Sequence, residues 1–335
     1  MKNKVCCFGE LLMRLSPNTG EDWINNNMPF HIGGAELNVA TALAKWDIPV
    51  KYVTSLPKNY LSDQLIKYIV QKNIEANDIV FSGNRIGIYY LPIGYDLKNA
   101  VAFYDRDNTS FSGLKPGVID WDKIFSDCSW FHFSAISPGL NENVAAVCKE
   151  ALEAAAAKGL TISVDLNYRS KLWQYGKQAV NIMPDLMKHC NVIMGNVWAV
   201  ESLLGIKSNI ESSTGKSHQQ LIDAAGQSML QLHKQYPQAS TFAYTYRLQN
   251  SYWTIMQHGK ERAVSNEYDV NDTVDKVGSG DCFMAGLIYG LIEKNSTQNI
   301  VEYAAAAAVG KLYEAGDATK QRQTDIIERI KSVTN

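Results

Sequence analysis

The feature that most constrains the fold of this chain is an alternation of short apolar runs with longer amphipathic segments. Repeated βα units with apolar strands predict a mostly parallel sheet covered by helices on both faces. The expected elements are strand 5–8, helix 37–46, strand 50–54, helix 61–70, strand 130–134, helix 144–157, strand 161–167, helix 180–187, strand 192–195, helix 218–235, strands 242–246 and 252–256, and helices 281–294, 298–314 and 323–332.

The alternation is interrupted between residues 84 and 110. Two β-rich runs, 85–93 and 100–106, flank the turn-like segment Gly94–Asn99, which predicts a hairpin. Tyr104 and Arg106 are two residues apart and share one face of the second strand. Such a polar, tyrosine-rich hairpin is typical of a lid. We therefore expect a three-layer α/β/α domain of residues 1–335 with a small β-sheet lid contributed by about 12–33 and 84–110.

Composition excludes several classes of protein. The chain has 335 residues, 46% of them apolar and 20% charged, which is ordinary for a soluble globular enzyme. A net charge of −2 gives no reason to expect nucleic acid or an anionic membrane as a partner. The six cysteines are scattered without a CxxC pair, and no segment approaches the length of a membrane span. Because Glu10 and Arg14 interrupt the first apolar run too early for a signal peptide, we expect a cytoplasmic protein.

The chemistry of the chain is indicated by the sequence Gly278-Ser279-Gly280-Asp281, which is followed at once by a helical apolar repeat. A glycine loop that leads into a helix N-terminus offers unpaired N–H groups and the positive end of the helix dipole to an anion. A carboxylate beside such an anion hole needs a reason to be there. We expect Asp281 to take the proton from a hydroxyl that attacks a phosphoryl group. The alternative is a glycine-rich loop that serves only chain geometry.

A second group of polar residues lies at the start of the helix expected over 37–46. Gly33-Gly34 would let a ligand approach the backbone, and the side chain of Asn38 could bond a hydroxyl. In open α/β sheets the ligand crevice lies at the carboxyl ends of the strands, where this loop is expected. The alternative is a simple turn followed by an asparagine near a helix N-terminus.

A third group follows the strand expected over 161–167. Alternation places Asp165, Asn167 and Arg169 on one face as the chain leaves the sheet. The planar guanidinium of Arg169 can bond two oxygens at once and suits a carboxylate or a phosphate. The alternative is a solvated arginine at a strand end.

These three groups resemble, in order, three motifs of the ribokinase-like (PfkB) sugar kinases, and the resemblance covers essentially the whole chain. Within that family the sequence resembles the 2-keto-3-deoxygluconate kinases most, in segments 8–10, 33–36, 86–89, 103–106, 132–138 and 165–169. The resemblance implies a ribokinase-like fold and the use of ATP with Mg²⁺. It also implies phosphorylation of the terminal 6-hydroxyl of the sugar acid.

The resemblance also implies roles for individual residues. The sugar acid would be bound by Gly34, Asn38, Tyr89, Tyr104, Arg106, Ile136 and Arg169, with Asp165 and Asn167 supporting them. Asp281 would be the base, and backbone N–H groups of Gly278, Ser279 and Gly280 would hold the phosphoryl oxygens. ATP contacts would come from Asn196, Thr245 and Arg247, and no residue is assigned as a metal ligand. The two arginines, Arg106 and Arg169, would face the sugar-acid carboxylate, a charge that neutral sugars lack.

The sequence departs from the family pattern at three places. Lys276-Val277 and Ser279 stand where two Thr and an Ala are common, and Ala199 replaces the acidic residue of the Asn-x-x-Glu element. The nucleotide loop Thr245–Asn250 has no glycines. Two alternatives therefore stay open: a kinase of fructose or another neutral sugar, and a catalytically weak protein that binds sugar acids. A homo-oligomer formed through the exposed lid sheet is a further expectation.

Overall fold

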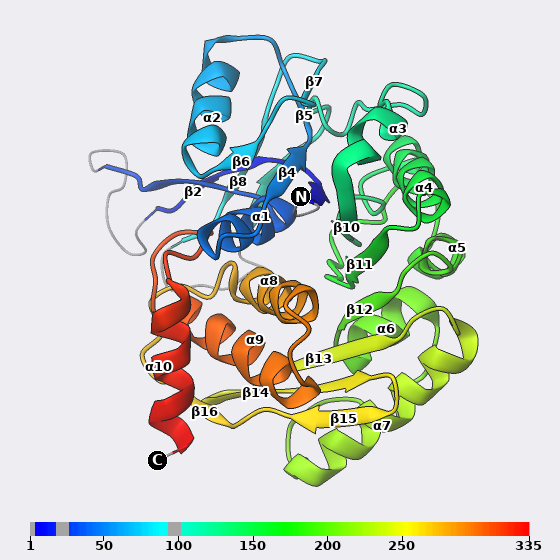
Figure 1. The fold of residues 1–335 in the computed structure, drawn as a ribbon. Helices are drawn as coiled ribbons and strands as arrows, with labels where there is room; N and C mark the ends of the chain where they lie inside the picture. The colour runs from blue at the N-terminus through cyan, green and yellow to red at the C-terminus, as the bar shows by residue number, and fades with distance from the viewer. Residues whose placement is uncertain (1–3, 18–26, 93–101, 335) are drawn as a thin grey trace.

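The fold is a central β-sheet between two layers of helices (Figure 1), as seen in a computed structural model that describes residues 4–17, 27–92 and 102–334. Among these residues the main sheet is ten-stranded, in the order β15-β14-β13-β12-β11-β10-β1-β4-β6, with β16 paired to β14. The strands from β13 through β6 are parallel to their neighbours, and β14, β15 and β16 are antiparallel. Their bounds are β1 Lys4–Phe8, β4 Val50–Val53, β6 Ile74–Glu75, β10 Cys128–Ser134, β11 Thr161–Asp165, β12 Val192–Gly195, β13 Thr241–Arg247, β14 Ser251–His258, β15 Glu261–Val264 and β16 Tyr268–Asp269.

Helices cover both faces of this sheet, each over its own hydrophobic core (Figure 1). One layer holds α1 Ala35–Lys45, α2 Tyr60–Gln71, α8 Ser279–Ile292, α9 Thr297–Leu312 and α10 Gln323–Thr334. The other holds α3 Trp121–Ile124, α4 Glu142–Ala157, α5 Met183–Met187, α6 Val197–Leu204 and α7 His218–Gln235. Alternate residues of β1 enter the two cores, Val5 and Cys7 on one side and Cys6 and Phe8 on the other. This two-sided burial explains why the strands read as continuous apolar runs.

A separate small sheet has the strand order β3-β2-β8-β9. Its strands are β2 Leu12–Leu15, β3 Phe30–Gly33, β8 Gly87–Tyr90 and β9 Phe103–Asp105, and a further parallel pair is formed by β5 Ser55–Leu56 and β7 Val80–Phe81. The expected hairpin is confirmed, because β8 and β9 pair antiparallel with Tyr89 opposite Tyr104. Its expected turn, Gly94–Asn99, lies outside the described residues. The expected three-layer α/β/α fold with a small separate sheet is thus confirmed.

Several elements differ from the sequence-based expectation in their bounds or existence. The helix expected from residue 281 begins at Ser279, because Gly278 adopts a left-handed conformation (φ 80°) that starts the helix two residues earlier. The strand expected over 161–167 ends at Asp165. Short α3, α6 and β15 were not expected, since four to eight residues give too little periodicity to recognise.

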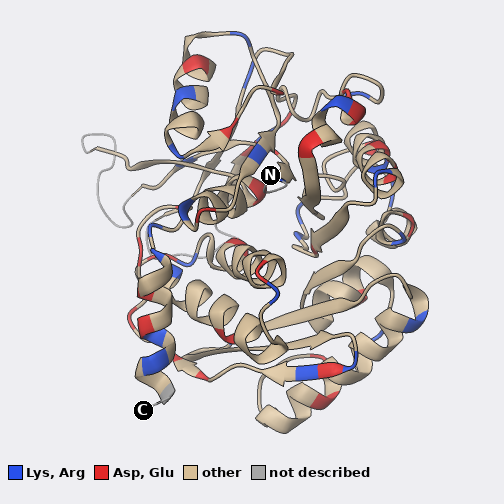
Figure 2. Cartoon of the chain, viewed as in Figure 1, with Lys and Arg blue, Asp and Glu red and all other residues tan. Residues whose placement is uncertain are grey.

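Charged residues of both signs are interspersed over the helices (Figure 2), as the net charge of −2 suggests. The six cysteines are free thiols, and all except the half-buried Cys128 are buried. None of the helices within 4–17, 27–92 and 102–334 combines the length and the apolar character needed to cross a membrane.

Candidate active site

A cavity of about 500 Å³ opens at the edge where the parallel strands have their carboxyl ends. It brings together every residue to which the family resemblance assigned a role. These residues are Gly34, Asn38, Tyr89, Tyr104, Arg106, Ile136, Asp165, Asn167, Arg169, Asn196, Thr245, Arg247, Gly278, Ser279, Gly280 and Asp281. Segments from both halves of the chain and from the small sheet therefore meet at one place.

The N-terminus of α8 opens into this cavity. The first intrahelical hydrogen bond runs from Cys282 N–H to the Gly278 carbonyl at 2.8 Å, so the N–H groups of the preceding turn have no intrahelical acceptor. A Cβ atom on Gly278 would lie 1.8 Å from the carbonyl oxygen of Asp317, so only glycine allows this close approach. The turn can therefore present its N–H groups and the helix dipole to an anion in the cavity.

Asp281 lies in the first turn of α8 and is 8% exposed. Its Oδ2 accepts a hydrogen bond from Asn38 Nδ2 at 2.7 Å, which fixes the orientation of the carboxyl group. Burial raises the pKa of Asp281 to about 6, although the hydrogen bond from Asn38 and the charge of Arg169 act in the opposite direction. Asn38 Oδ1 is buried and has no hydrogen-bond partner among the described residues, so it is an acceptor available to a ligand hydroxyl.

Two further buried carboxyl groups, Glu36 and Asp165, lie close enough to Asp281 to interact electrostatically. Burial and the charge of Asp281 raise the pKa of Asp165 to about 8, so this group holds its proton at neutral pH. Burial likewise raises the pKa of Glu36 to about 7, against the hydrogen bonds that its Oε1 accepts from the N–H (2.9 Å) and Oγ (2.6 Å) of Ser134. These buried carboxyl groups beside the cavity are therefore incompletely ionised at neutral pH.

The two arginines expected to face a carboxylate differ in their surroundings. Arg106 is 8% exposed and forms an ion pair with Glu10, whose Oε1 also accepts a hydrogen bond from Thr109 Oγ1 at 2.6 Å. The charge of Arg106 is thus balanced by the protein itself. Arg169 donates one long hydrogen bond, of 3.3 Å, to the carbonyl of Tyr168. Its charge lowers the pKa of Asp165 and of Asp281. Arg169 is consequently the better-placed arginine for an anionic ligand.

An ion-pair network that the sequence did not reveal joins the small sheet to the α8 loop. Arg14 of β2 pairs with Asp275 and, through Nε, with Asp317 Oδ1 at 2.9 Å. Tyr89 of β8 donates to Asp317 Oδ2 at 2.7 Å, and Asp275 Oδ1 accepts the N–H of Val277 at 3.0 Å. Asp275 directly precedes Lys276-Val277, but nothing local in the sequence marks Arg14 or Asp317, because the residues they contact are more than two hundred positions away in the chain.

Close packing gives a second reason for glycine at positions 33 and 34, besides the expected approach of a ligand to the backbone. A Cβ atom on Gly33 would lie 2.2 Å from a carboxyl oxygen of Asp317. Gly34 has φ 128°, and a Cβ atom there would lie 2.3 Å from the carbonyl oxygen of Glu10. Close packing of the protein around these two residues therefore requires glycine, and Gly34 still lines the cavity.

The residues proposed for the nucleotide, Asn196, Thr245 and Arg247, line the same cavity. Asn196 Oδ1 accepts the N–H of Ala199 at 2.9 Å and so caps α6. Arg247 donates to the carbonyl of Lys276 at 3.4 Å. Arg247 and Lys276 also line a second cavity of about 650 Å³, whose walls include the apolar residues Leu248, Val270 and Leu312. No group of three or more His, Cys, Asp or Glu side chains in the described part of the chain is placed to hold a metal ion.

The known proteins that this chain resembles include carbohydrate kinases. The crystal structure of 2-dehydro-3-deoxygluconokinase from Thermotoga maritima is 31% identical, with a TM-score of 0.88 over 98% of this chain and 99% of that one. The 2-dehydro-3-deoxygalactonokinase of Haloferax volcanii is 26% identical over 98% of this chain and 97% of its own. Fructokinase from Xylella fastidiosa with bound ATP shares the fold at 19% identity, with a TM-score of 0.79 over 100% of both chains.

The sequence profile of the pfkB carbohydrate kinases matches residues 2–323, nearly the full length of the chain. The resemblance drawn from the three motifs is thereby confirmed, and the most similar relatives named above include kinases of 2-dehydro-3-deoxy sugar acids. This chain belongs to the pfkB family of carbohydrate kinases.

Proposed function

We propose that this kinase transfers the terminal phosphoryl group of ATP to the 6-hydroxyl of 2-keto-3-deoxygluconate, also called 2-dehydro-3-deoxygluconate. One observation carries the proposal: a single cavity joins Asp281 at the N-terminus of α8 to Arg169 at the end of β11. The first provides a base beside an anion hole, and the second provides a cation for a substrate carboxylate. The names of the relatives from Thermotoga maritima and Haloferax volcanii support the same class of substrate.

Asp281 is the proposed general base. Above pH 6 its carboxyl group is largely ionised. The hydrogen bond that its Oδ2 accepts from Asn38 restrains the rotation of the carboxyl group. The second oxygen can orient the 6-hydroxyl and accept its proton as the new O–P bond forms. Asn38 Oδ1, which has no partner in the described part of the chain, can accept a hydrogen bond from another sugar hydroxyl.

The first turn of α8 is proposed to hold the transferring phosphoryl group. The transition state of phosphoryl transfer is loose, and its charge is spread over the equatorial oxygens. N–H groups of Gly278, Ser279 and Gly280 that are already oriented stabilise this charge without reorganisation during the reaction. The hydrogen bond from Val277 N–H to Asp275 helps to fix the loop in that orientation.

ATP fits the second cavity by the chemistry of its lining. The apolar side chains of Leu248, Val270 and Leu312 suit the base, and Arg247 and Lys276 lie where the two cavities meet and suit the phosphates. The Xylella fastidiosa fructokinase, which shares this fold, was solved with ATP. The described residues offer no metal cage, so we propose that Mg²⁺ is carried by the ATP phosphates and water.

Arg169 is proposed to recognise the sugar-acid carboxylate. An Arg169→Lys variant should raise the KM for ketodeoxygluconate by about tenfold or more, because a point charge cannot reproduce the two-pronged guanidinium contact. The kcat should change much less, since the carboxylate is remote from the transferred phosphoryl group. An unchanged KM would show that Arg169 does not bind the carboxylate.

The small sheet is proposed to act as a lid and as a contact between subunits. Its inner face lines the cavity with Leu12, Tyr89 and Tyr104, and a closed sheet would exclude water from the reacting phosphate. Its outer face carries an apolar row across four strands, Phe30, Leu15, Tyr90 and Phe103, in which the two phenylalanines are 49% and 64% exposed. Light scattering should find a homo-oligomer that Phe103→Glu dissociates; a monomeric wild type would refute this contact.

A coupled assay of ADP release tests the proposed activity. Purified protein with Mg–ATP is offered ketodeoxygluconate, ketodeoxygalactonate, fructose and ribose side by side, and phosphorus NMR locates the phosphate on the product. We expect the highest kcat/KM with ketodeoxygluconate and a 6-phosphorylated product. Preference for fructose or ribose would identify a neutral-sugar kinase. Binding of the sugar acid without ADP release from any acceptor would identify a binding protein.

A further inference from the structure

Lys311 is a fully buried lysine that the proposed reaction does not yet use. It lies in the last turn of α9 and is 0% exposed. Its ammonium donates a hydrogen bond to the carbonyl oxygen of Glu314 at 2.9 Å, and the carboxylates of Asp275 and Asp317 act on it at longer range. A charge removed from water is costly unless the surroundings compensate it. The position of Lys311 shows what this charge can do.

The side chain of Lys311 packs directly behind the anion-binding turn. A Cβ atom on Gly278 would lie 3.3 Å from Lys311 Cε, so the lysine stem forms the floor beneath that glycine. The carbonyl of the next residue, Leu312, accepts the N–H groups of Val274 at 2.8 Å and Asp275 at 3.1 Å. Lys311 therefore stands between the C-terminus of α9 and the loop that leads into α8.

This junction creates an electrostatic conflict. The carbonyl end of α9 has negative potential, and it faces the same loop that presents N–H groups to a phosphoryl anion. A cation in the last turn of α9 offsets that potential. Burial lowers the pKa of Lys311 below its usual value, and the carboxylates of Asp275 and Glu314 offset part of this effect. Lys311 also lowers the pKa of Asp281, which keeps the base ionised.

We propose that Lys311 is a positioning residue for phosphoryl transfer: a fixed internal cation that acts through the Gly278 turn and stabilises the phosphoryl charge without touching it. The inference rests on the proposed function and deepens it. Lys276 is a half-buried lysine that lines both cavities, so water and salt screen its charge. The same charge in the dry interior beneath Gly278 acts over a lower effective dielectric.

Lys311→Met and Lys311→Ala test the proposal, with Lys45→Met as the matched control. Lys45 is also a last-turn lysine, in α1, but its side chain is exposed. Methionine fills the space of the lysine without its charge, whereas alanine leaves room for an added alkylammonium ion. Calorimetric titration with ATP and with ADP, in the absence of sugar, measures how strongly the site holds the terminal phosphate. Sugar kinetics between pH 5 and 9 measure kcat, KM and the acid limb of kcat/KM.

For Lys311→Met we expect about a tenfold loss of the preference for ATP over ADP and a fall in kcat of about 10- to 100-fold, with little change in the sugar KM. The acid limb should move above its wild-type position near pH 6. Propylammonium should restore activity to Lys311→Ala but not to Lys311→Met, a result that a merely structural role would not give. Lys45→Met should match the wild type.

The proposal is overturned if folded Lys311→Met keeps the wild-type ATP preference, kcat and acid limb, or if Lys311→Ala loses activity that propylammonium does not restore. Should the methionine variant fail to fold, the alanine variant with and without propylammonium decides alone. The proposed function fails separately, when the wild type releases ADP with none of the sugars. In that case the comparison of ATP with ADP still tests Lys311.

Discussion

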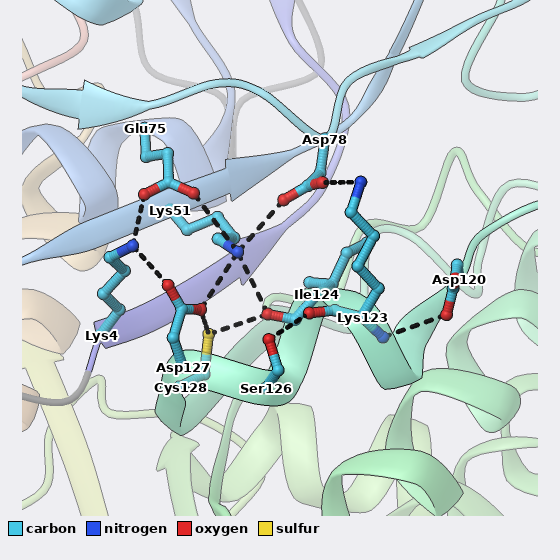
Figure 3. Close-up of polar contacts among 10 residues, drawn as sticks. All are labelled: Lys4, Lys51, Glu75, Asp78, Asp120, Lys123, Ile124, Ser126, Asp127 and Cys128. Carbon is cyan, nitrogen blue, oxygen red and sulfur yellow. Dashed lines mark hydrogen bonds and ion pairs between the residues drawn. The ribbon is translucent and has the colours of Figure 1, made fainter.

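The two edges of the central sheet both bury charged residues, but they treat the charges in opposite ways. At the amino ends of the parallel strands, Lys51 of β4 is surrounded by acceptors (Figure 3). Its ammonium lies 3.1 Å from Asp78, 3.2 Å from Asp127 and 3.4 Å from Glu75. Burial alone would lower the pKa of Lys51, but these carboxylates, Asp78 first, raise it well above its usual value. Lys4, Lys51, Glu75, Asp78 and Asp127 form what we call the amino-edge cluster.

At the carboxyl ends of the same strands, a group of buried carboxyl groups lies beside the cavity. Glu36, Asp165 and Asp281, which we call the carboxyl trio, all have a raised pKa, in each case first of all because of burial. Arg169 lowers the pKa of Asp165 and Asp281 but does not form an ion pair with either within the described structure.

The difference separates stability from reactivity on a single scaffold. Balanced charges contribute to folding and have no tendency to exchange protons near neutral pH. Unbalanced buried carboxyl groups cost stability, and they acquire pKa values in the range that proton transfer at neutral pH requires. Substitutions at the two edges should therefore have opposite consequences.

Asp281→Asn should have the largest effect, and only on activity. Asparagine keeps the shape and the contact with Asn38 but cannot accept the hydroxyl proton, so kcat should fall by about two orders of magnitude or more. Removing a buried ionisable group should leave the free energy of unfolding unchanged or slightly increased. Steady-state kinetics and urea unfolding of the same preparation measure both quantities.

The wild-type pH dependence is the companion measurement. Because the pKa of Asp281 is about 6, kcat/KM should decline as the pH falls through that value and the base becomes protonated. A flat profile down to pH 5, or wild-type turnover by Asp281→Asn, would remove Asp281 from the role of base.

Lys51→Met should have the next largest effect, and only on stability. It leaves the partly buried carboxylates of Glu75, Asp78 and Asp127 without their shared cation. The free energy of unfolding should fall by about 2 kcal/mol, within the range for unsatisfied buried polar groups. The kcat should not change, because the cluster lies at the opposite edge of the sheet from the cavity. A loss of kcat with unchanged stability would contradict the division between the edges.

Much of the fold and of the cavity lining followed from sequence, because both depend on local patterns. The helix expected over 218–235 coincides with α7, and the glycine loop before Asp281 marked the helix N-terminus to within two residues. Asp165 ends β11, while Asn38 and Asp281 lie in the first turns of α1 and α8. Loops and helix N-termini at the carboxyl ends of parallel strands meet at one edge of the sheet whatever their separation in the chain.

The pairing of charges could not be predicted in the same way. Lys4 contacts Glu75 and Asp127, which are 71 and 123 residues away, and no local pattern selects these partners. The same holds for Arg106, which lines the cavity and also pairs with Glu10, a partner that no local pattern indicates. The sequence around Lys311 does not indicate that the residue is buried, because its burial depends on the packing of α9 against the loop before α8. Partner choice is a property of tertiary structure.

Asp165→Asn sharpens the comparison through the pH dependence of stability. The pKa of Asp165 is about 8 in the folded protein and about 4 in an unfolded chain, so the folded state binds its proton more tightly. That contribution is fully present below about pH 4 and is lost as the pH rises through 8. Between pH 5 and 8 the wild type should lose at least about 1.4 kcal/mol more stability than the variant, the equivalent of one pKa unit. Urea unfolding at both values of pH measures this, and parallel curves for the two proteins would show that Asp165 is ionised when folded.

Lys123→Met should have the smallest effect and serves as the control for Lys51→Met. Both lysines approach Asp78, but the side chain of Lys123 is 73% exposed and its Nζ lies 3.6 Å from the carboxylate (Figure 3). An exposed ion pair is screened by water and salt, so the free energy of unfolding should change by less than about 0.5 kcal/mol. If Lys123→Met destabilised the protein as much as Lys51→Met, burial would not be what distinguishes the two contacts. The amino-edge cluster would then stabilise the fold through its net charge alone, and added salt should weaken the effects of both variants equally.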